Sequence, residues 1–230
     1  MSSIEELIAT RRDQLIIGHE FMRRLDGAGD MAALRRLLPR LGFFTFAFQD
    51  MLKLAREACS DPVLTPLVRS LELGDLGHDR WYVMDLDDLG IRPSAHELFG
   101  VEYEVGRRVA YELIASITRA RSDHARLALL LTLEAAAREF FIRVPGFAAR
   151  SGLEHELRYF GRTHLEAEEA HDVFAQAGQQ TLTNIIVPPA LAAEVVEAVE
   201  KTFLQMLRLA DDLAAAMAGR NMPESTLEGR

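Results

Sequence analysis

The sequence predicts an all-α fold, a single bundle of seven to eight helices. Two observations predict this class. Serine and threonine residues in helix-capping positions precede long stretches of helix-forming residues, and glycine or proline residues separate these stretches. Alternating apolar and polar runs typical of strands are absent, as are internal repeats. We expect residues 1–220 to form one domain and residues 221–230 to form a flexible C-terminal tail.

Four helices are expected in the N-terminal half. Their ranges are residues 3 to about 24, a short segment ending at Leu38, Leu41 to about Ala58, and Pro66 to Leu89. Ser3 and Glu6 form a capping-box pattern at the start of the first helix. Thr65-Pro66 starts the fourth, because proline suits the first helical position. The third helix is unusually aromatic, and its phenylalanines are expected to be largely buried: Phe43, Phe44, Phe46 and Phe48.

Four more helices are expected in the C-terminal half. Their ranges are Ala95 to about Arg119, Ser122 or Asp123 to just before Pro145, Ser151 to about Gly178, and Pro188 to about Ala218. Ser94 with Glu97, and Ser151 with Glu154, repeat the capping-box pattern. The one extended-looking run, residues 181–187, is too short to indicate a sheet.

The composition excludes several classes of protein. Lys plus Arg number 26 against 35 Asp plus Glu, and the resulting net charge of −9 argues against binding to nucleic acid or to an anionic membrane surface. The single cysteine, Cys59, excludes an intramolecular disulfide and suits a reducing compartment. The N-terminus lacks the basic start of a signal peptide, and no segment approaches the ~18 apolar residues of a membrane span. The expected location is the cytoplasm.

The most informative stretch runs from Arg158 to His171 and is predicted to be helical throughout. At 3.6 residues per turn, His164, Glu168 and His171 fall within roughly 60° of one another on one helix face. Two imidazoles and a carboxylate are donors that suit a first-row transition metal. Gly161 is expected to leave space beside His164. The alternative is a charged amphipathic helix whose histidines are hydrogen-bonded or solvated.

A second pair of candidate ligands lies in the helix from Pro66. Asp75 and His78 are three residues apart and therefore share a helix face. Gly74 and Gly77 are unfavourable inside a helix, so close packing or room for a ligand is expected there. The alternative interpretation is that Asp75 is a solvated acid and that His78 is a core histidine bonded to a carbonyl group. Trp81 and Asp85 follow at one-turn intervals as candidate second-shell or substrate-contacting residues.

A third candidate, Glu134, stands among apolar residues over nearly three helical turns. Burial of an unpaired carboxylate is costly, so either a metal ion or Arg138, one turn on, would neutralise it. Together these stretches supply three histidines and three carboxylates, which suits two metal ions. The six predicted ligands are Asp75, His78, Glu134, His164, Glu168 and His171.

Over roughly residues 41–177 the chain resembles the heme-oxygenase-like di-iron oxidases and oxygenases, which include the iron-containing redox enzymes. Three features carry the resemblance: the run His164-x-x-x-Glu168-x-x-His171, Glu134 before it, and the string Gly77-His78-Asp79-x-Trp81-x-x-x-Asp85-Leu86-x-x-Leu89-Gly90. Thiaminase II and pyrroloquinoline-quinone synthase share the fold superfamily. The thiaminase-like branch would need a nucleophilic cysteine in the pocket, whereas Cys59 stands at a helix end.

The resemblance implies a heme-oxygenase-like bundle, commonly a homodimer, with two irons between its core helices; manganese is the alternative metal. It implies an O₂-dependent oxidoreductase acting on a small amino-acid-like or fatty-acid-like substrate by N-oxygenation, C–C cleavage or desaturation, with an external electron donor. Arg138 and Tyr159 are candidate second-shell or substrate residues. The alternative function is a metal-free binding or interaction protein with an incomplete site.

The sequence departs from the family pattern at one ligand. Members usually take a further carboxylate from the helix before the His78 helix. In this chain that helix is the aromatic one, which offers only Gln49, Asp50 and Glu57. Asp50 is the expected extra ligand, with Glu72 from the next helix as the substitute. If neither reaches the site, the second metal position stays incomplete.

Overall fold

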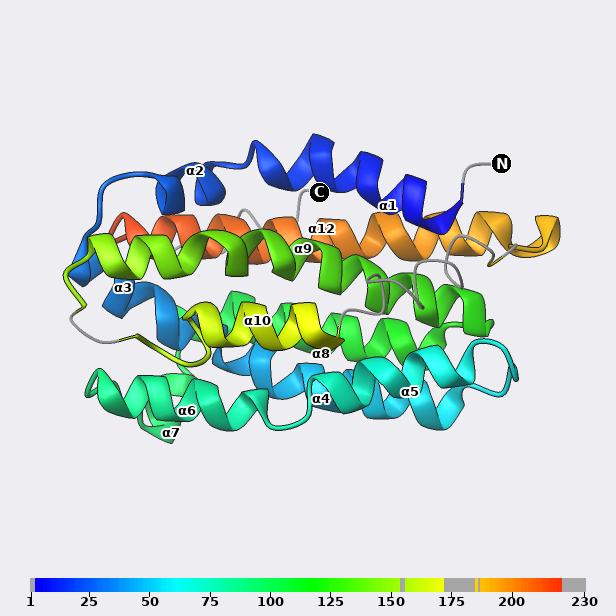
Figure 1. Ribbon diagram of the computed structural model, residues 1–230, viewed down its shortest axis with the longest axis horizontal. Helices are drawn as coiled ribbons and strands as arrows, with labels where there is room; N and C mark the ends of the chain where they lie inside the picture. Colours follow the sequence, from blue (N-terminus) through cyan, green and yellow to red (C-terminus); the bar gives the residue numbers. More distant parts are fainter. Residues whose placement is uncertain (1–2, 154–155, 172–184, 186, 221–230) are drawn as a thin grey trace.

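The computed structural model describes residues 3–153, 156–171, 185 and 187–220 (Figure 1). Within those residues every regular element is a helix, so the predicted all-α class is confirmed. Most of the helices run along the long axis of the molecule (Figure 1). The predicted C-terminal tail and the short extended run, apart from residues 185 and 187, lie outside the described residues.

The helices follow one another along the chain with short connections. The α-helices are α1 (Ile4–Arg12), α2 (Glu20–Asp26), α3 (Met31–Leu37), α4 (Gly42–Ala58), α5 (Thr65–Gly74), α6 (His78–Asp88), α7 (Ala95–Leu98), α8 (Glu104–Arg119), α9 (Asp123–Arg150), α10 (Arg162–His171) and α12 (Ala192–Met217). A π-helix covers Asp13–Ile17, and 3₁₀-helices cover Leu38–Leu41, Val101–Tyr103 and Pro189–Leu191.

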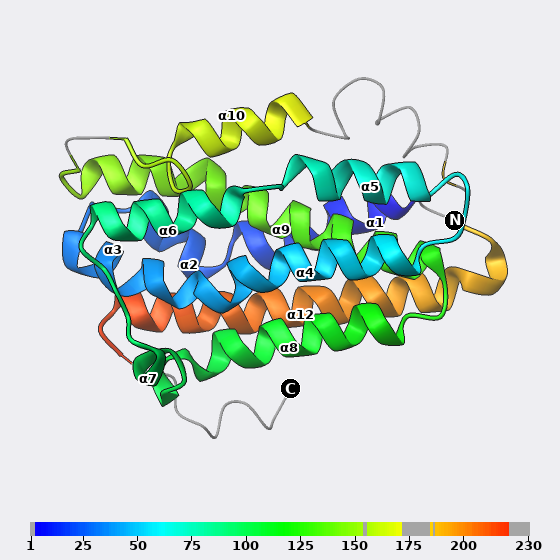
Figure 2. The same ribbon diagram turned by 90° about the horizontal axis from the view of Figure 1, so that it is seen from below.

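The centre of the bundle is built on its longest helices. α12 packs against α9 and α8, while α4 packs against α8 and α5 (Figure 2). α9 buries large apolar residues over its whole length, from Leu127 to Phe147. α10 lies on the outside of this core against α9 and α5. The segment that carries His164 therefore packs on a close-packed, rigid core.

Local capping signals placed several helix starts correctly. The capping boxes of Ser3 with Glu6 and of Ser94 with Glu97 are both formed, with each side chain bonded to the other residue's backbone amide. Ser151, however, ends α9 instead of starting a helix. Its predicted partner Glu154 lies outside the described residues.

Some predicted helices are interrupted. The first changes to a π-helix at Asp13 and stops at Gly18 before α2 begins. The helix expected from Ala95 breaks after Leu98, and α8 begins only at Glu104. Interruptions of this kind leave the bundle class unchanged, since the broken pieces still bury apolar residues in one core.

α9 continues through Pro145 to Arg150, so the prediction that it ends before Pro145 was wrong. A proline inside a helix removes one backbone hydrogen bond and costs roughly 3 kcal/mol. The following turn buries Phe147 and Ala148, and Val144 just before it is also buried. Burial of one large apolar side chain is worth about 1.5–3 kcal/mol, so this packing outweighs the cost of the proline.

The aromatic helix α4 is only partly buried. Phe44 is 7% exposed, whereas Phe46 is 47% exposed, so the expectation of burial was wrong for Phe46. At about 100° per residue, Phe44 shares the core face with Ala47 and Met51, and Phe46 points away from it. The Phe46 ring instead packs edge-on against Tyr82, with the ring centroids 5.7 Å apart.

A buried ion pair joins the 3₁₀-helix Leu38–Leu41 to α12, the last of the described helices. Arg40 Nη1 donates to Asp212 Oδ1 over 3.0 Å, and Asp212 is 1% exposed. The second carboxylate oxygen of Asp212 has no hydrogen-bond partner among the described residues. Burial raises the pKa of Asp212 to about 6, although Arg40 acts in the opposite direction.

This pair predicts an unusual pH dependence of stability. Asp212 in the unfolded chain has a pKa of about 4, so between pH 4 and 6 the folded state binds more protons, and stability falls as pH rises. Two pKa units correspond to about 3 kcal/mol. Relative to wild type, the Asp212→Asn variant should therefore gain about that much unfolding free energy between pH 4 and pH 7. Urea unfolding at several pH values measures this difference.

The exposed Asp50 supplies the matched control for Asp212, since Asp50→Asn makes the same substitution without burial. The wild-type and Asp50→Asn proteins should show the same trend of stability with pH. If wild type and Asp212→Asn also gave parallel curves, the assignment of this pH dependence to Asp212 would be wrong.

Candidate metal centre

Three of the predicted ligands meet at one place in the structure. Asp75, His78 and His164 each offer one donor atom, and these atoms all lie within 4.8 Å of one another. His78 Nδ1 lies 3.0 Å from Asp75 Oδ1 and 2.9 Å from His164 Nε2. Both histidines are buried, with exposures of 5% for His78 and 1% for His164. The donors come from segments far apart in the sequence, and only the fold brings them together.

The chain breaks between α5 and α6 to place Asp75 and His78. Gly77 has φ +93°, a left-handed conformation that residues with a side chain adopt only with strain, and His78 opens the new helix. A Cβ atom at Gly77 would meet nothing within 4 Å, so the glycine is needed for backbone conformation and not for space. The prediction of one continuous helix from Pro66 to Leu89, with Gly77 in its interior, was wrong.

Gln49 from α4 holds the Asp75 segment from the other side. Its amide nitrogen donates to the Asp75 carbonyl oxygen over 2.6 Å and also to the Asp75 carboxylate. Trp81 stacks on the His78 ring, with centroids 4.7 Å apart and an interplanar angle of 25°. The side chains of Asp75 and His78 are thus fixed from both α4 and α6.

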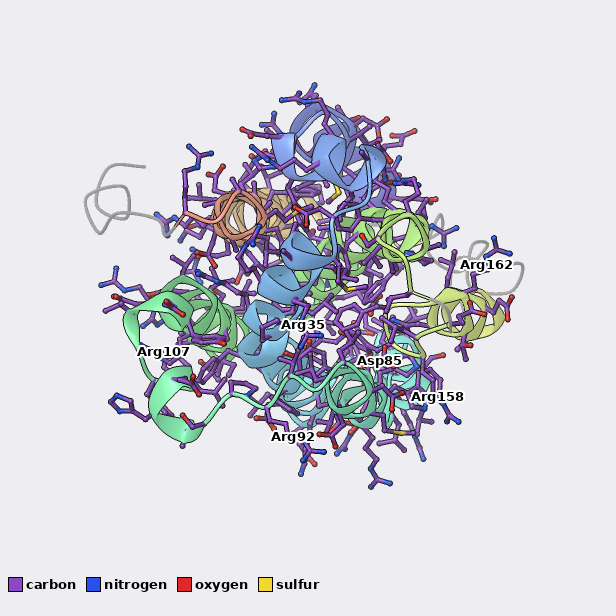
Figure 3. The ribbon with its side chains drawn as sticks, turned by 90° about the vertical axis from the view of Figure 1, so that its left-hand side faces the viewer. Arg35, Asp85, Arg92, Arg107, Arg158 and Arg162 are labelled. Carbon is purple, nitrogen blue, oxygen red and sulfur yellow. The ribbon has the colours of Figure 1, made fainter. Side chains whose placement is uncertain are left out.

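His164 is positioned by a loop that is anchored on Asp85. The two carboxylate oxygens of Asp85 accept the backbone N–H groups of Arg158 at 2.8 Å, Tyr159 at 2.8 Å and Phe160 at 3.0 Å. Asp85 is 1% exposed (Figure 3). Burial raises the pKa of Asp85, and the three backbone donors partly offset this effect. A buried carboxylate that ties down three successive amides makes this loop rigid.

The same loop sets the tautomer of His164. The Tyr159 carbonyl oxygen lies 2.9 Å from His164 Nδ1, and a carbonyl can only accept, so Nδ1 carries the proton. His164 Nε2 then presents its lone pair to His78 Nδ1. The lone pairs of Asp75 and His164 converge on one imidazole proton of His78, and a metal ion would replace that proton.

Residues 158–161 are this loop, and α10 begins only at Arg162, so the prediction of helix from Arg158 onward was wrong. The amides that would bond within a first helical turn bond to Asp85 instead. Gly161 also differs from its prediction. A Cβ atom there would lie 1.7 Å from the Leu157 carbonyl oxygen, so the missing side chain admits that backbone and not a ligand.

Aromatic side chains enclose the histidine cluster. The Phe141 ring meets His164 edge-on with centroids 4.0 Å apart, and the Tyr159 ring stacks on it at 4.6 Å. The Tyr159 hydroxyl pairs with the Thr45 hydroxyl at 3.2 Å. This apolar wall limits the access of water, and the resulting low dielectric strengthens interactions between charged groups inside.

Of the other predicted ligands, the structure describes the side chains of Glu134, Asp50 and Glu72. Glu134 is half-buried on α9 and is not a member of the three-donor group in the described structure. Glu168 and His171 lie in helix α10, but their side chains are not among those that the structure describes. Asp50 is exposed, and Glu72 pairs with Arg56 Nε at 2.5 Å.

The predicted second-shell residues have identifiable roles in three cases. Trp81 stacks on His78, while Asp85 and Tyr159 together position His164. Arg138 is half-buried on α9. Arg158 and Arg162 are exposed (Figure 3).

Sequence reasoning missed Gln49 and Phe141 as members of the site. Gln49 was visible only as one of three polar residues on the aromatic helix. Phe141 carries no sequence signal, because a phenylalanine that packs on an imidazole looks like any core residue.

Comparison with models of known protein families and with curated protein sequences gives no match to this chain. Among the described residues, no helix combines the length and apolar character needed to cross a membrane.

The chemistry of the three donors is suited to a borderline divalent cation. Two imidazole nitrogens and one carboxylate oxygen favour iron, zinc, manganese or cobalt over calcium or magnesium, which prefer oxygen alone. The hydrogen bond from His164 Nδ1 to a backbone carbonyl is the support that ligating histidines ordinarily have. The residues present therefore fit a metal ion.

Proposed function

We propose that the protein binds a divalent transition metal at Asp75, His78 and His164, and that this site is part of a di-iron centre of the heme-oxygenase-like oxidase type. Glu134, Glu168 and His171 would complete the second metal position. The observation that carries the proposal is the convergence of three donor atoms within 4.8 Å in a buried, aromatic-walled place.

When bound, iron in such a site supplies the activation of dioxygen for oxidation of a substrate. The chain's own residues do the remaining work. His164 is held in the tautomer that directs Nε2 inward, through the Tyr159 carbonyl and the Asp85 carboxylate. Phe141, Tyr159 and Trp81 exclude water from the donor atoms. A small amino-acid-like or fatty-acid-like substrate is the class that the sequence resemblance favours.

Anaerobic titration with Fe(II) tests the proposal, with Mn(II) and Zn(II) titrated in parallel. The three described donors account for one ion per chain, and two ions are expected if the remaining ligands complete the second position. A metal that binds only the folded state stabilises it by about 2.7 kcal/mol at a hundred times its dissociation constant, so the melting temperature should rise. Dioxygen added to the iron-loaded protein should then be consumed.

The Glu112→Gln variant is the control, because it changes an exposed carboxylate on α8 that is neither in the three-donor group nor among the predicted ligands. Its metal content should equal that of wild type. Absence of bound metal at saturating Fe(II), together with an unchanged melting temperature, would refute the metal site. In that case the hydrogen-bonded Asp75–His78–His164 cluster would be a structural element of a metal-free binding protein.

A further inference from the structure

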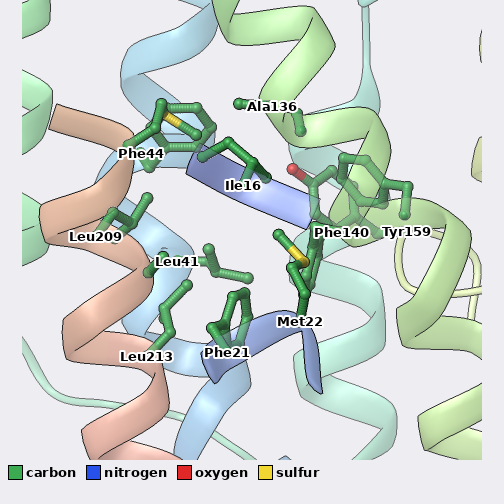
Figure 4. A pocket seen from close by; sticks show the side chains of 14 residues that line it. Ile16, Phe21, Met22, Leu41, Phe44, Ala136, Phe140, Tyr159, Leu209 and Leu213 are labelled. Atoms are coloured by element: carbon green, nitrogen blue, oxygen red, sulfur yellow. The ribbon is translucent and has the colours of Figure 1, made fainter. Parts of the chain in front are cut away.

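An apolar cavity of about 40 Å³ lies between helices of the bundle. Figure 4 shows the side chains that line it. Its lining comes from the π-helix, α2, the 3₁₀-helix Leu38–Leu41, α4, α9, α12 and the loop that carries Tyr159. The side chains that matter most here are Ile16, Ala136, Phe141, Tyr159 and Ala210. Protein interiors are close-packed and contain few voids larger than a water molecule, so a cavity of this size calls for an explanation.

The cavity is suited to an apolar occupant and not to water. By volume it could hold about three water molecules, at ~10–15 Å³ each. A buried water needs two to four polar partners, and the lining residues are aliphatic or aromatic. The one hydroxyl among them, that of Tyr159, already pairs with Thr45. We therefore expect a dry cavity, as is usual for apolar cavities in proteins.

Small side chains and a π-helix border this space. Small residues, Ala136 and Ala210, face it from the two longest helices, where larger residues would fill it. The π-helix Asp13–Ile17 contributes Ile16 to the wall. π-helices are rare and occur frequently at functional sites, because they cost stability. This π-helix is an observation independent of the cavity itself.

The cavity and the histidine cluster share a wall. Phe141 and Tyr159 line the cavity, and the same two rings contact His164 with centroid distances of 4.0 and 4.6 Å. A molecule in the cavity is therefore separated from His164 by a single layer of aromatic rings.

We propose that this cavity binds a small apolar molecule and, in the metal-loaded protein, holds dioxygen next to the metal centre. Dioxygen is uncharged and needs no hydrogen-bond partner, so a dry apolar cavity can hold it without the cost of leaving a polar group unsatisfied. A diatomic molecule fits the volume, whereas a long alkyl chain does not. The second half of the proposal rests on the proposed function, and the first half does not.

Xenon is the probe for the metal-free protein, because it is apolar and of similar size. Crystals pressurised with xenon should show one bound atom in the cavity by anomalous scattering. Ala210→Leu should lose this atom, since the added carbons occupy the space, and Ala193→Leu should keep it, since Ala193 is exposed on the same helix. Ala136→Val is a milder filling variant in case Ala210→Leu does not fold.

Absence of xenon from wild type, or ordered water in the cavity, would overturn the first half of the proposal. The second half is tested by the rate of Fe(II) oxidation at increasing dioxygen concentration. The filling variants should bind iron as wild type does and react several-fold more slowly at low dioxygen. If they lost xenon but reacted at the wild-type rate, the dioxygen assignment would be wrong while the metal site would stand. If the protein bound xenon but no iron, the proposed function and the dioxygen assignment would both be wrong. The first half of the proposal, a cavity for a small apolar molecule, would stand.

Discussion

Replacement of Asp85 by alanine is expected to destabilise the protein by about 3–5 kcal/mol, because it removes a buried charged acceptor from three backbone amides at once. Each amide left buried and unsatisfied costs about 1–3 kcal/mol, and partial relaxation of the loop recovers some of this. Urea unfolding of the metal-free protein measures the loss. Asp88→Ala is the matched control, since Asp88 is exposed near the end of the same helix.

The same variant should weaken metal binding by about 10–100-fold, the usual effect of removing a group that orients a ligating histidine. The physical reason is the chain of contacts from Asp85 through the Tyr159 backbone to His164 Nδ1. Asp85→Asn keeps one acceptor oxygen and should give an intermediate result for both quantities. A variant that lost stability but kept full metal affinity would show that the loop does not orient His164.

Replacement of His164 by alanine is expected to abolish metal binding at the described site. Only Asp75 and His78 would remain of the three donors, and two donors do not hold a borderline cation tightly. The rise in stability with Fe(II), about 2.7 kcal/mol at a hundred times the dissociation constant, should disappear. Calorimetry with added metal measures the binding, and melting temperatures measure the stabilisation.

His96→Ala is the control for this substitution, because His96 is exposed on α7 and is not a member of the three-donor group. It should leave metal content unchanged. Since His164 is 1% exposed, its replacement also leaves a cavity, and His164→Gln preserves more of the volume. Unaltered metal content in the His164→Ala variant would rule out His164 as a ligand, whereas His164→Gln serves to compare folding stability.

Local signals in the sequence were sufficient for the fold class and for several helix starts. Ser3 with Glu6 and Ser94 with Glu97 form the capping boxes that their spacing predicts. Capping depends on residues within one turn, so it can be read without knowledge of the fold. Non-local packing decided the exceptions. α9 passes through Pro145 because the turn beyond it is buried, and no local pattern reports that burial.

The candidate site shows the same division. The sequence by itself determined that Asp75, His78 and His164 are among six side chains whose donor atoms suit metal ions. Only the tertiary structure decided that they meet, and that Asp85 and Gln49 hold them in place. The reason is physical: the chemistry of a side chain is a local property, whereas the amides that Asp85 binds lie more than 70 residues away along the chain. Folding alone brings such partners together.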